Sequence, residues 1–429
     1  MVNNNRMRGA LQAVQAGMKL MSPDLALRSA AVAELAKQDL EPAQLPLVEQ
    51  ALAHETEPAL KARLSQLRAS MLVASPDKAR RLEAAQLLAD SREASVKSLV
   101  QERLGVETDP EVKGALLSAL GRIESRLAWG ERLGVVFTGL SLGSILLLAA
   151  LGLAITYGLM GVINMAHGEL MMVGAYATYV VQNLFRAYAP GAFDYYLWLA
   201  VPVSFLASAV VGAVLERTVL RWLYGRPLET LLATWGISLI LMQGVRSLFG
   251  AQNVPVENPA WLSGGIDVMS NLTLPYNRIA IIAFAFAVLG GVALLIARTR
   301  LGLFVRGVTQ NRRMAACTGI NTARIDTYAF SLGAGIAGLA GCALSQVGNV
   351  GPDLGQNYIV DSFMVVVLGG VGQLAGTVYA ALGLGVLNKL LEGVAGAVLA
   401  KIMVLVFIVV FIQKRPQGLF AMKGRSAEA

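Results

Sequence analysis

The sequence predicts an all-α membrane protein, a polytopic helix bundle of about eight or nine spans preceded by a helical repeat domain. Hydrophobic residues make up 55% of the 429 positions and charged residues only 15%, which is unusual for a soluble globular chain. From Leu133 onward long apolar stretches alternate with short polar loops, whereas the preceding residues are rich in Ala, Leu and charge. We expect a repeat domain at 1–127, a transmembrane domain at 128–420 and a cytoplasmic tail at 421–429.

The first part contains an internal repeat. SPDLALRSAAVAEL at 22–35 recurs as SPDKARRLEAAQLL at 75–88, and ETEPALKARLSQL at 55–67 recurs as ETDPEVKGALLSAL at 107–120. Each copy places Ser or Thr before a proline, a pattern typical of helix starts in which the hydroxyl caps free amides. Stacked helix pairs of this kind predict a short α-solenoid of HEAT type. A charged coiled coil is the alternative, but the prolines interrupt any long heptad run.

The second part contains apolar stretches, most of them long enough to cross a hydrocarbon core of about 30 Å. We expect helices, because in lipid only a helix or a closed barrel satisfies its own backbone. One stretch is long enough for two passes, with Gly369, Gly370, Gly372 and Gly376 at the turn or as packing positions. The stretches lie at 133–159, 161–183, 195–216, 229–249, 279–297, 326–347, 358–390 and 398–413.

The charges in the loops predict the topology. Arg and Lys are frequent at 217–226, at 298–324 and after Gln413, whereas 250–277 contains neither. By the positive-inside rule the first three segments, and with them the C-terminus, are cytoplasmic and the fourth is outside.

Several function classes are excluded by what the sequence lacks. Cys317 and Cys342 have no CxxC spacing or histidine cluster, so we expect no metal site and no disulfide framework. The glycine-rich segments 331–341 and 368–385 are not followed by Gly-Lys-Ser/Thr, so we expect no nucleotide and no cofactor. The net charge of +8 is concentrated in the first third and in loops, which argues against nucleic-acid binding. An intramembrane hydrolase is disfavoured because the sequence contains no GxGD motif, the pattern that supplies paired aspartates at membrane depth.

The first cluster of chemical interest is GLMGVINMAHGELMMVGAY at 158–176. It places Asn164, His167 and Glu169 inside an apolar stretch, where ionisable groups are costly and normally face a cavity or another helix. On a continuous helix 164 and 167 share a face and 169 does not, but a break at the glycines of this segment brings all three to one cavity. An Asn amide then pairs with a solute and a carboxylate holds the His tautomer. We predict a solute path lined by Asn164, His167, Glu169 and Tyr176. The alternative is a helix break whose polar groups only cap the backbone.

The second cluster is TRLGLFVRGVTQNRRMAACTGINTARIDTYAF at 299–330, a loop rich in arginine. Its residues 314–317 predict a short helix of small residues that ends at Gly319 and fits a groove on a soluble partner. The alternative is an ordinary positive-inside loop, but connecting loops are usually far shorter. We expect Arg312 and Arg313 to be exposed and to contribute little to folding. The candidate docking residues are Arg306, Asn311, Arg312, Arg313, Ala315, Ala316, Gly319, Ile320 and Asn321.

Residues from about 133 to 420 resemble the LivH family of permeases from bacterial branched-chain amino-acid ABC importers. The resemblance rests on GVINMAHGE at 161–169, on the loop at 299–321, on VVLGGVGQLAGTVYAALGLG at 366–385 and on RPQGLF at 415–420. The repeat domain and the segment 127–158 resemble the long-form permeases of urea importers, called UrtB. Members of that form usually begin with a secretory signal, whereas Met1–Leu20 holds no apolar core of the necessary length.

This resemblance implies a multi-pass protein of the bacterial inner membrane. It implies a heterodimer with a second permease, two cytoplasmic ATPase subunits and an extracytoplasmic solute-binding protein. ATP hydrolysis then occurs in the partners, so this chain is not an enzyme, and the loop at 306–321 relays closure of the ATPases. Urea is the first expectation for the solute, and branched-chain amino acids are the alternative. A passive urea or amide channel, which needs no docking loop, is the alternative from another class. We favour the periplasmic side for the repeat domain.

Overall fold

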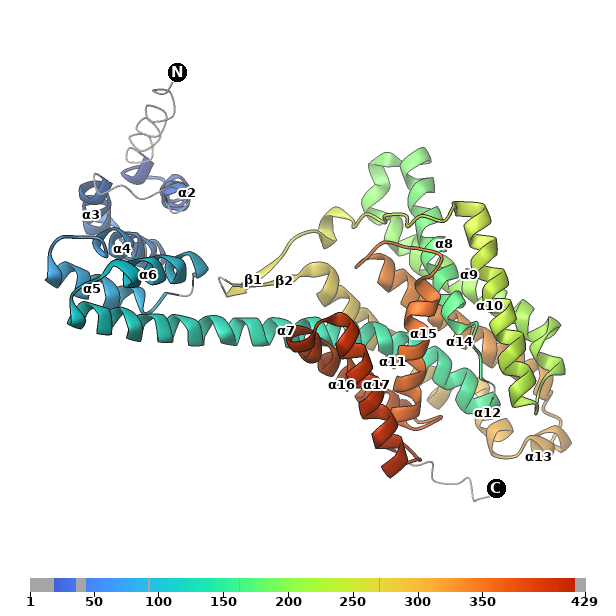
Figure 1. Ribbon diagram of the computed structural model, residues 1–429. Coiled ribbons are helices and arrows are strands. Elements are labelled where there is room, and N and C mark those ends of the chain that lie inside the picture. The colour runs from blue at the N-terminus through green and yellow to red at the C-terminus, as the bar shows by residue number, and fades with distance from the viewer. Residues whose placement is uncertain (1–18, 36–43, 92, 162, 270, 421–429) are drawn as a thin grey trace. The chain divides into compact units, whose positions relative to one another are not determined.

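The computed structural model describes residues 19–35, 44–91, 93–161, 163–269 and 271–420, and the chain divides into two compact units (Figure 1). The first unit comprises Met1–Leu133 together with Asp267–Thr273, and the second comprises Gly134–Ile266 and Leu274–Ala429. The predicted tail at 421–429 lies outside the described residues.

The first unit is helical. Its described helices are α2 (Leu25–Leu35), α3 (Leu45–His54), α4 (Pro58–Leu72), α5 (Lys78–Leu88), α6 (Ala94–Val106) and the first part of α7 (Pro110–Met160). Two apolar clusters form its interior, one centred on α2 to α4 and one on α5, α6 and the start of α7, with a contribution from the end of α4. The α7 helix then continues without interruption into the second unit, because no proline or glycine pair breaks it.

The two copies of the sequence repeat make matching side-chain contacts. Arg28 donates to the carbonyl oxygens of the Ser-Pro pair before α2 at 3.0 Å and to Glu55 at 2.9 Å. Arg81 donates in the same way to the Ser-Pro pair before α5, and its Nε lies 3.0 Å from Glu107. In both copies that carboxylate also accepts from the next two backbone amides. Each copy is therefore a three-helix unit in which the same arginine and buried glutamate pair, and its assignment to the HEAT type stays a prediction.

The caps differ from the expected ones. Asp24 and Asp77, not the serines, accept from the first-turn amides of α2 and α5, at 2.9 and 3.0 Å. The serines accept from the aspartate amides instead. An aspartate is the better cap here because its charge also favours the positive end of the helix.

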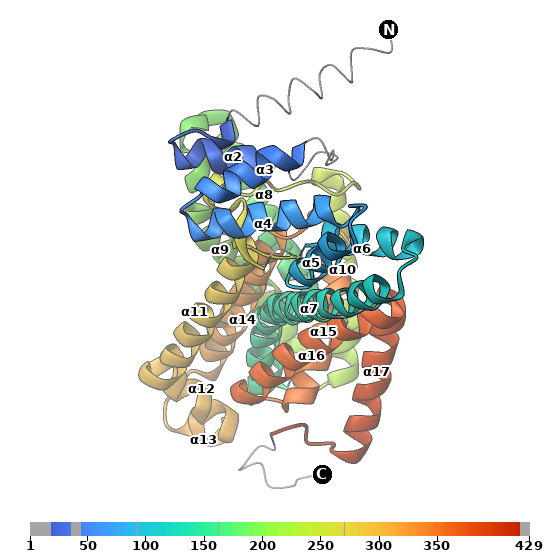
Figure 2. The same cartoon turned by 90° about the vertical axis from the view of Figure 1, so that its left-hand side faces the viewer.

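The second unit is a bundle whose long helices correspond to the predicted apolar stretches (Figure 2). After α7 they are α8 (His167–Tyr188), α9 (Tyr196–Thr218), α10 (Pro227–Phe249), α11 (Tyr276–Arg298), α14 (Thr322–Ser345), α15 (Leu354–Gly369), α16 (Leu374–Ala395) and α17 (Ala397–Lys414). Seven described helices are long and apolar enough to cross a membrane, whereas α8 and the short α15 do not meet both criteria. The all-α polytopic bundle is thus confirmed. The stretch 358–390 is divided between α15 and α16 as predicted.

Shorter elements connect these helices. Three are 3-10 turns, η2 (Pro190–Tyr195), η3 (Leu220–Trp222) and η4 (Ala260–Leu262), and two are the short helices α12 (Arg300–Gln310) and α13 (Arg312–Cys317). A two-stranded sheet of β1 (Gly265–Met269) and β2 (Leu272–Pro275) occupies the loop before α11 and was not predicted.

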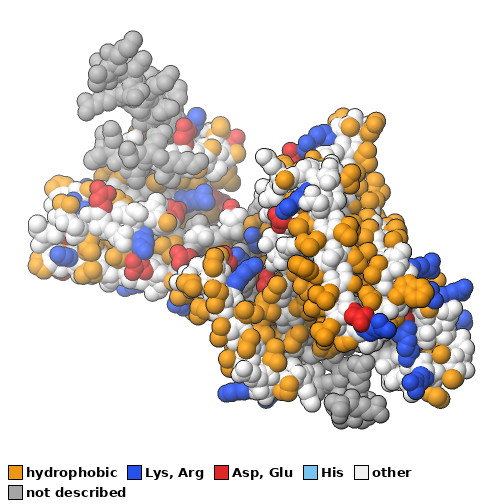
Figure 3. Space-filling view, turned by 45° about the vertical axis from the view of Figure 1, so that its right-hand side comes forward, with side chains coloured by type: hydrophobic (Ala, Val, Ile, Leu, Met, Phe, Trp, Pro, Cys, Tyr) orange, Lys and Arg blue, Asp and Glu red, His pale blue; other side chains and the backbone are white. Residues whose placement is uncertain are grey.

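Exposed hydrophobic side chains cover the flank of the second unit (Figure 3). Leu206 and Val210 of α9 and Leu232 and Ile240 of α10 are each more than half exposed. Such a surface is stable only where lipid or another apolar chain covers it.

The most buried span, α14, packs through its glycines. A Cβ atom added at Gly341 would lie 1.9 Å from the Met171 carbonyl oxygen of α8, and one at Gly338 would lie 2.4 Å from the Ser204 carbonyl oxygen of α9. Because glycine has no side chain, the helix backbones touch at these positions, which is how helices associate tightly in lipid. The glycine-rich segment 331–341 is therefore a packing surface.

The four glycines of the α15–α16 region have two roles. Gly370 and Gly372 lie in the turn with φ of +97° and +80°, values that side chains rarely tolerate. Gly369 and Gly376 face each other across the turn, and a Cβ atom added at Gly376 would lie 1.9 Å from the Gly369 carbonyl oxygen. The end of the chain returns to this turn, where the Leu419 amide donates to the Leu368 carbonyl at 2.8 Å.

Candidate functional site

The helix break predicted at 158–176 is present between α7 and α8. The α7 helix ends at Met160, Gly161 has a φ of +66°, and α8 begins at His167. Asn164 lies in the connecting segment and not on a helix. Asn164 and His167 therefore do not share a helical face, and the break predicted in place of a continuous helix brings them together.

Asn164 and His167 both hold backbone groups at the break. The Asn164 Oδ1 accepts from the Ala166 amide at 3.1 Å, and its carbonyl accepts from the His167 amide at 3.3 Å. The His167 Nε2 lies 2.9 Å from the Ala149 carbonyl oxygen of α7. These contacts brace the start of α8 against α7.

Glu169 and Tyr176 lie further along α8. The Ser238 hydroxyl of α10 donates to Glu169 Oε1 at 3.0 Å. The described contacts pair Glu169 with Ser238 and His167 with Ala149, so the expected Glu–His pair is absent from the described residues because each side chain reaches a different helix. The Tyr176 ring packs against Phe249 with 4.7 Å between ring centroids.

The four side chains share one further property. Each is at most 2% exposed and has one polar atom without a hydrogen-bond partner among the described residues. Leaving a buried polar atom unpaired costs about 1–3 kcal/mol, so four such atoms along one helix start are unusual. The atoms are Asn164 Nδ2, His167 Nδ1, Glu169 Oε2 and the Tyr176 hydroxyl.

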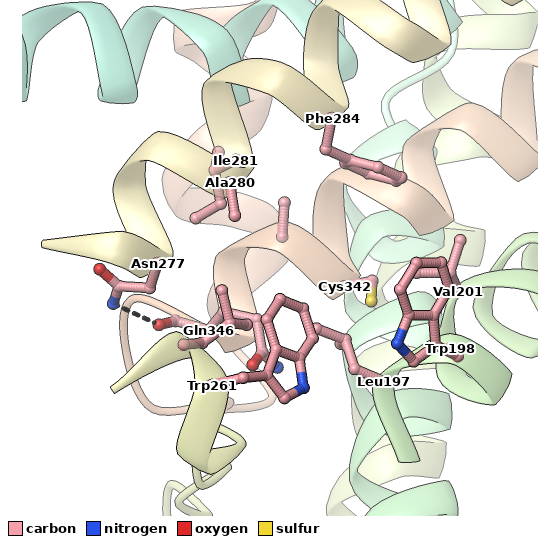
Figure 4. Close-up of a pocket in the computed structure, with 12 residues that line it drawn as sticks. Leu197, Trp198, Val201, Trp261, Asn277, Ala280, Ile281, Phe284, Cys342 and Gln346 are labelled. Atoms are coloured by element: carbon pink, nitrogen blue, oxygen red, sulfur yellow. Dashed lines mark hydrogen bonds between the residues drawn. The ribbon is translucent and has the colours of Figure 1, made fainter. Parts of the chain in front are cut away.

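A pocket in the second unit lies elsewhere (Figure 4). It has a volume of about 190 Å³ and is bounded by α9, η4, α11 and the end of α14. Trp198 and Trp261 are stacked beside it at 6.4 Å, and at its base Asn277 donates to the Gln346 carbonyl at 3.1 Å. None of the four predicted path residues lines it, so the polar atoms of α8 are closed off in this conformation.

The predicted docking loop folds into α12 and α13. Asn311 caps α13 by accepting from the Met314 amide at 3.0 Å, and Asn321 caps α14 by accepting from the Arg324 amide at 3.1 Å. Gly319 ends the short helix with a φ of +85°. Asn311 and Asn321, two of the candidate docking residues, thus mark the starts of helices. An asparagine directly before a helical segment is a start signal that can be seen in the sequence.

The small-residue face of α13 is divided between the interior and the surface. Ala315 is buried against Val305, Val308 and Ile325, and Ile320 packs beside this cluster. The other candidate docking residues form an exposed surface, which comprises Arg306, Asn311, Arg312, Arg313, Ala316, Gly319 and Asn321.

Arg312 differs from its neighbour Arg313. Its guanidinium group forms an ion pair with Asp326, whose side chain is 4% exposed, and lies 5.4 Å from the centre of the Tyr224 ring. The expectation that Arg312 contributes little to folding is wrong, because losing it leaves a buried carboxylate without its cation. Sequence reasoning passed over Asp326, although an acidic residue at the start of an apolar stretch is the signal that identifies it.

The second unit also identifies the family. Residues 135–412, well over half of the chain, match the family described as the branched-chain amino acid transport system permease component. The chain belongs to this permease family. Its relatives are transport proteins, in agreement with the span-forming helices of the second unit.

Curated members of the permease family align along most of their length. The high-affinity branched-chain amino acid transport system permease protein BraD of Pseudomonas aeruginosa is 29% identical over 66% of this chain and 93% of its own. LivH of Escherichia coli K12 is 29% identical over 59% of this chain and 84% of its own. LivM of the same organism is 26% identical over 66% of this chain and 69% of its own. No solved structure matches significantly.

Proposed function

We propose that this chain is the membrane-spanning permease subunit of an ATP-driven importer for a small polar solute. It works with a second permease, two ATPase subunits and an extracytoplasmic solute-binding protein, and ATP is hydrolysed by the partners. Membership of the permease family supports this proposal. Docking of the ATPases is supported by α13, a six-residue helix between two longer helices. Its residues Arg313 and Ala316 are exposed and so are available to a partner.

Urea is the first candidate for the solute. Residues 1–133 of the first unit lie outside the matched residues 135–412, and their resemblance to the repeat domain of long-form urea permeases supports urea. The names of BraD and LivH support branched-chain amino acids as the alternative. The unpaired polar atoms of Asn164, His167, Glu169 and Tyr176 support a solute path along α8 in either case.

The experiment is transport by the complete importer in proteoliposomes. Uptake of radiolabelled urea and of leucine is measured with the binding protein outside and with ATP or a non-hydrolysable analogue inside. We expect uptake of one solute that requires ATP hydrolysis. Equal uptake with the analogue would overturn the proposal and support a passive channel instead.

The repeat domain is proposed to lie outside the cell membrane on the periplasmic side, with the C-terminus in the cytoplasm. The Asn271 amide of the β1–β2 hairpin donates to the Leu127 carbonyl of α7 at 2.9 Å, and both residues belong to the first unit. The hairpin is part of the loop at 250–277, and this loop contains no Lys or Arg. A domain bonded to a loop shares its side of the membrane, and the positive-inside rule puts this loop outside.

A further inference from the structure

Two buried carboxylates lie next to the proposed docking helix. Glu216 is near the end of α9 and is 1% exposed, and Asp326 is in the first turns of α14 and is 3% exposed. Acidic groups buried at the end of a membrane bundle are costly unless they are paired, so their partners indicate which elements must stay together.

Four elements meet at these carboxylates. Glu216 accepts from the Tyr224 hydroxyl at 2.8 Å and from the Thr327 hydroxyl of α14 at 2.6 Å. Asp326 forms its ion pair with Arg312 of α13, whose guanidinium group also covers the Tyr224 ring. The Arg312 ion pair therefore joins α13 to α14 together with the apolar contact between Ala315 and Ile325. Tyr224 extends the link to α9.

The same two helices reach α8. A Cβ atom added at Gly338 of α14 would lie 2.4 Å from both the Ser204 carbonyl oxygen and the Ser208 hydroxyl oxygen of α9, so the two helices are in direct contact. The Ser208 hydroxyl donates to the Leu170 carbonyl of α8 at 2.8 Å. Leu170 is adjacent to Glu169, one of the four residues with an unpaired polar atom. Close-packed helices of this kind shift as a unit and do not deform gradually.

We propose that Arg312 and Asp326 are positioning residues that transmit movement of α13 to the α8–α9–α14 group and so couple ATP hydrolysis to transport. This inference rests on the proposed function of the chain as an ATP-driven permease. Breaking the ion pair leaves α13 exposed and able to dock, but it weakens the link by which movement of α13 displaces α14. Contact alone does not establish coupling, so the test measures coupling directly.

The experiment compares Arg312→Gln, Asp326→Asn and the double variant in the complete importer, using whichever of urea and leucine the wild type transports. Uptake and ATP hydrolysis are measured per assembled complex. We expect the amount of solute imported per ATP to fall about tenfold in each single variant, within the usual range of coupling between sites. The double variant should be no worse than the poorer single variant, because both remove the same bond. The matched control is Arg298→Gln, an exposed arginine at the end of α11 without an ion pair among the described residues.

A second variant separates coupling from folding. Arg312→Lys keeps the charge that Asp326 needs but loses the two-armed contact, so it should assemble and recover part of the solute imported per ATP. A purely structural role would lower the amount of complex and leave this ratio unchanged. An unchanged ratio in the single variants, multiplied losses in the double variant, or a loss in Arg312→Lys equal to that in Arg312→Gln would overturn the inference. A wild type without ATP-dependent uptake would instead overturn the proposed function.

Discussion

At the scale of single residues, the polar side chains at the start of α8 have two roles that can be separated. One atom of Asn164 caps the backbone and the other has no partner among the described residues. His167 makes its contact through Nε2 and Glu169 through Oε1, and the second polar atom of each side chain has no partner among the described residues. Substitutions that keep one atom and change the other therefore distinguish bracing of the helix from contact with a solute.

Asn164→Asp and Asn164→Leu form such a pair. Both remove Nδ2, but Asp keeps the oxygen that accepts from Ala166, whereas Leu loses this hydrogen bond, which is worth about 1 kcal/mol. We expect reduced uptake in both variants and a lower melting temperature only for Leu. Uptake is measured per assembled complex, and stability is measured by fluorescence in detergent. Uptake by the Asp variant at the wild-type rate would limit Asn164 to bracing.

His167→Leu addresses the bracing contact. It removes the contact at 2.9 Å between the His167 ring and the Ala149 carbonyl, which links the start of α8 to α7. We expect a loss of about 1 kcal/mol of stability for the hydrogen bond alone, and less assembled complex. A normal yield of complex with normal melting would show that this contact is dispensable.

At the scale of helices, glycine contacts decide how the spans pack. Gly376 and Gly383 lie on the same helix, but only Gly376 faces a neighbouring backbone, that of Gly369. We expect Gly376→Ala to lower the melting temperature of the complex, because the added methyl group has no space. Gly383→Ala is the matched control, since nothing lies within 4 Å of its Cβ position. It should be neutral or slightly stabilising. Equal melting of the two variants would contradict the packing role.

The repeat domain offers a test of its own at this scale. Leu127 belongs to the buried cluster of the second repeat copy, so a fragment should extend past it. We expect residues 1–133 to form a soluble helical monomer because each copy has its own core. Circular dichroism and sedimentation measure this, and a spectrum of a disordered chain would refute the solenoid prediction.

The ion pairs of the two copies predict how the fragment responds to acid. The bond from Arg28, helped by the Glu57 amide, lowers the pKa of Glu55. Burial alone would raise the pKa of Glu107, but the Asp109 amide and Arg81 outweigh it, so this pKa is also lowered. A carboxyl with a lowered folded-state pKa stabilises the fold above its unfolded value of about 4.3 and loses this effect as the pH falls further.

We therefore expect the melting temperature of the fragment to fall below about pH 4. The double variant Glu55→Gln with Glu107→Gln should melt lower at pH 7 and depend less on acid. Scans of melting temperature against pH measure both effects. Equal acid dependence of the variant and the wild type would show that these two carboxyls do not determine it.

At the scale of the whole molecule, the open question is the side of the membrane on which the repeat domain lies. Ser98 is exposed on α6, and the native Cys317 is exposed at the end of α13. We expect Ser98→Cys to react with an impermeant maleimide added to intact spheroplasts, whereas Cys317 reacts only in inverted vesicles. Labelling of both positions from the same side would contradict the proposed topology.

The sequence by itself determined the membrane bundle, its family and the break before α8, because apolar length, loop charge and glycine placement are local properties of the chain. It also located α13, since Asn311 and Gly319 define the ends of that helix within a few residues. Only the tertiary structure decided which polar groups are partners. His167 reaches Ala149, Glu169 reaches Ser238, and Arg312 reaches Asp326 across helix contacts that sequence spacing does not specify. The same is true of the hairpin bond from Asn271 to Leu127, which joins residues 144 positions apart and becomes possible only when the chain is folded.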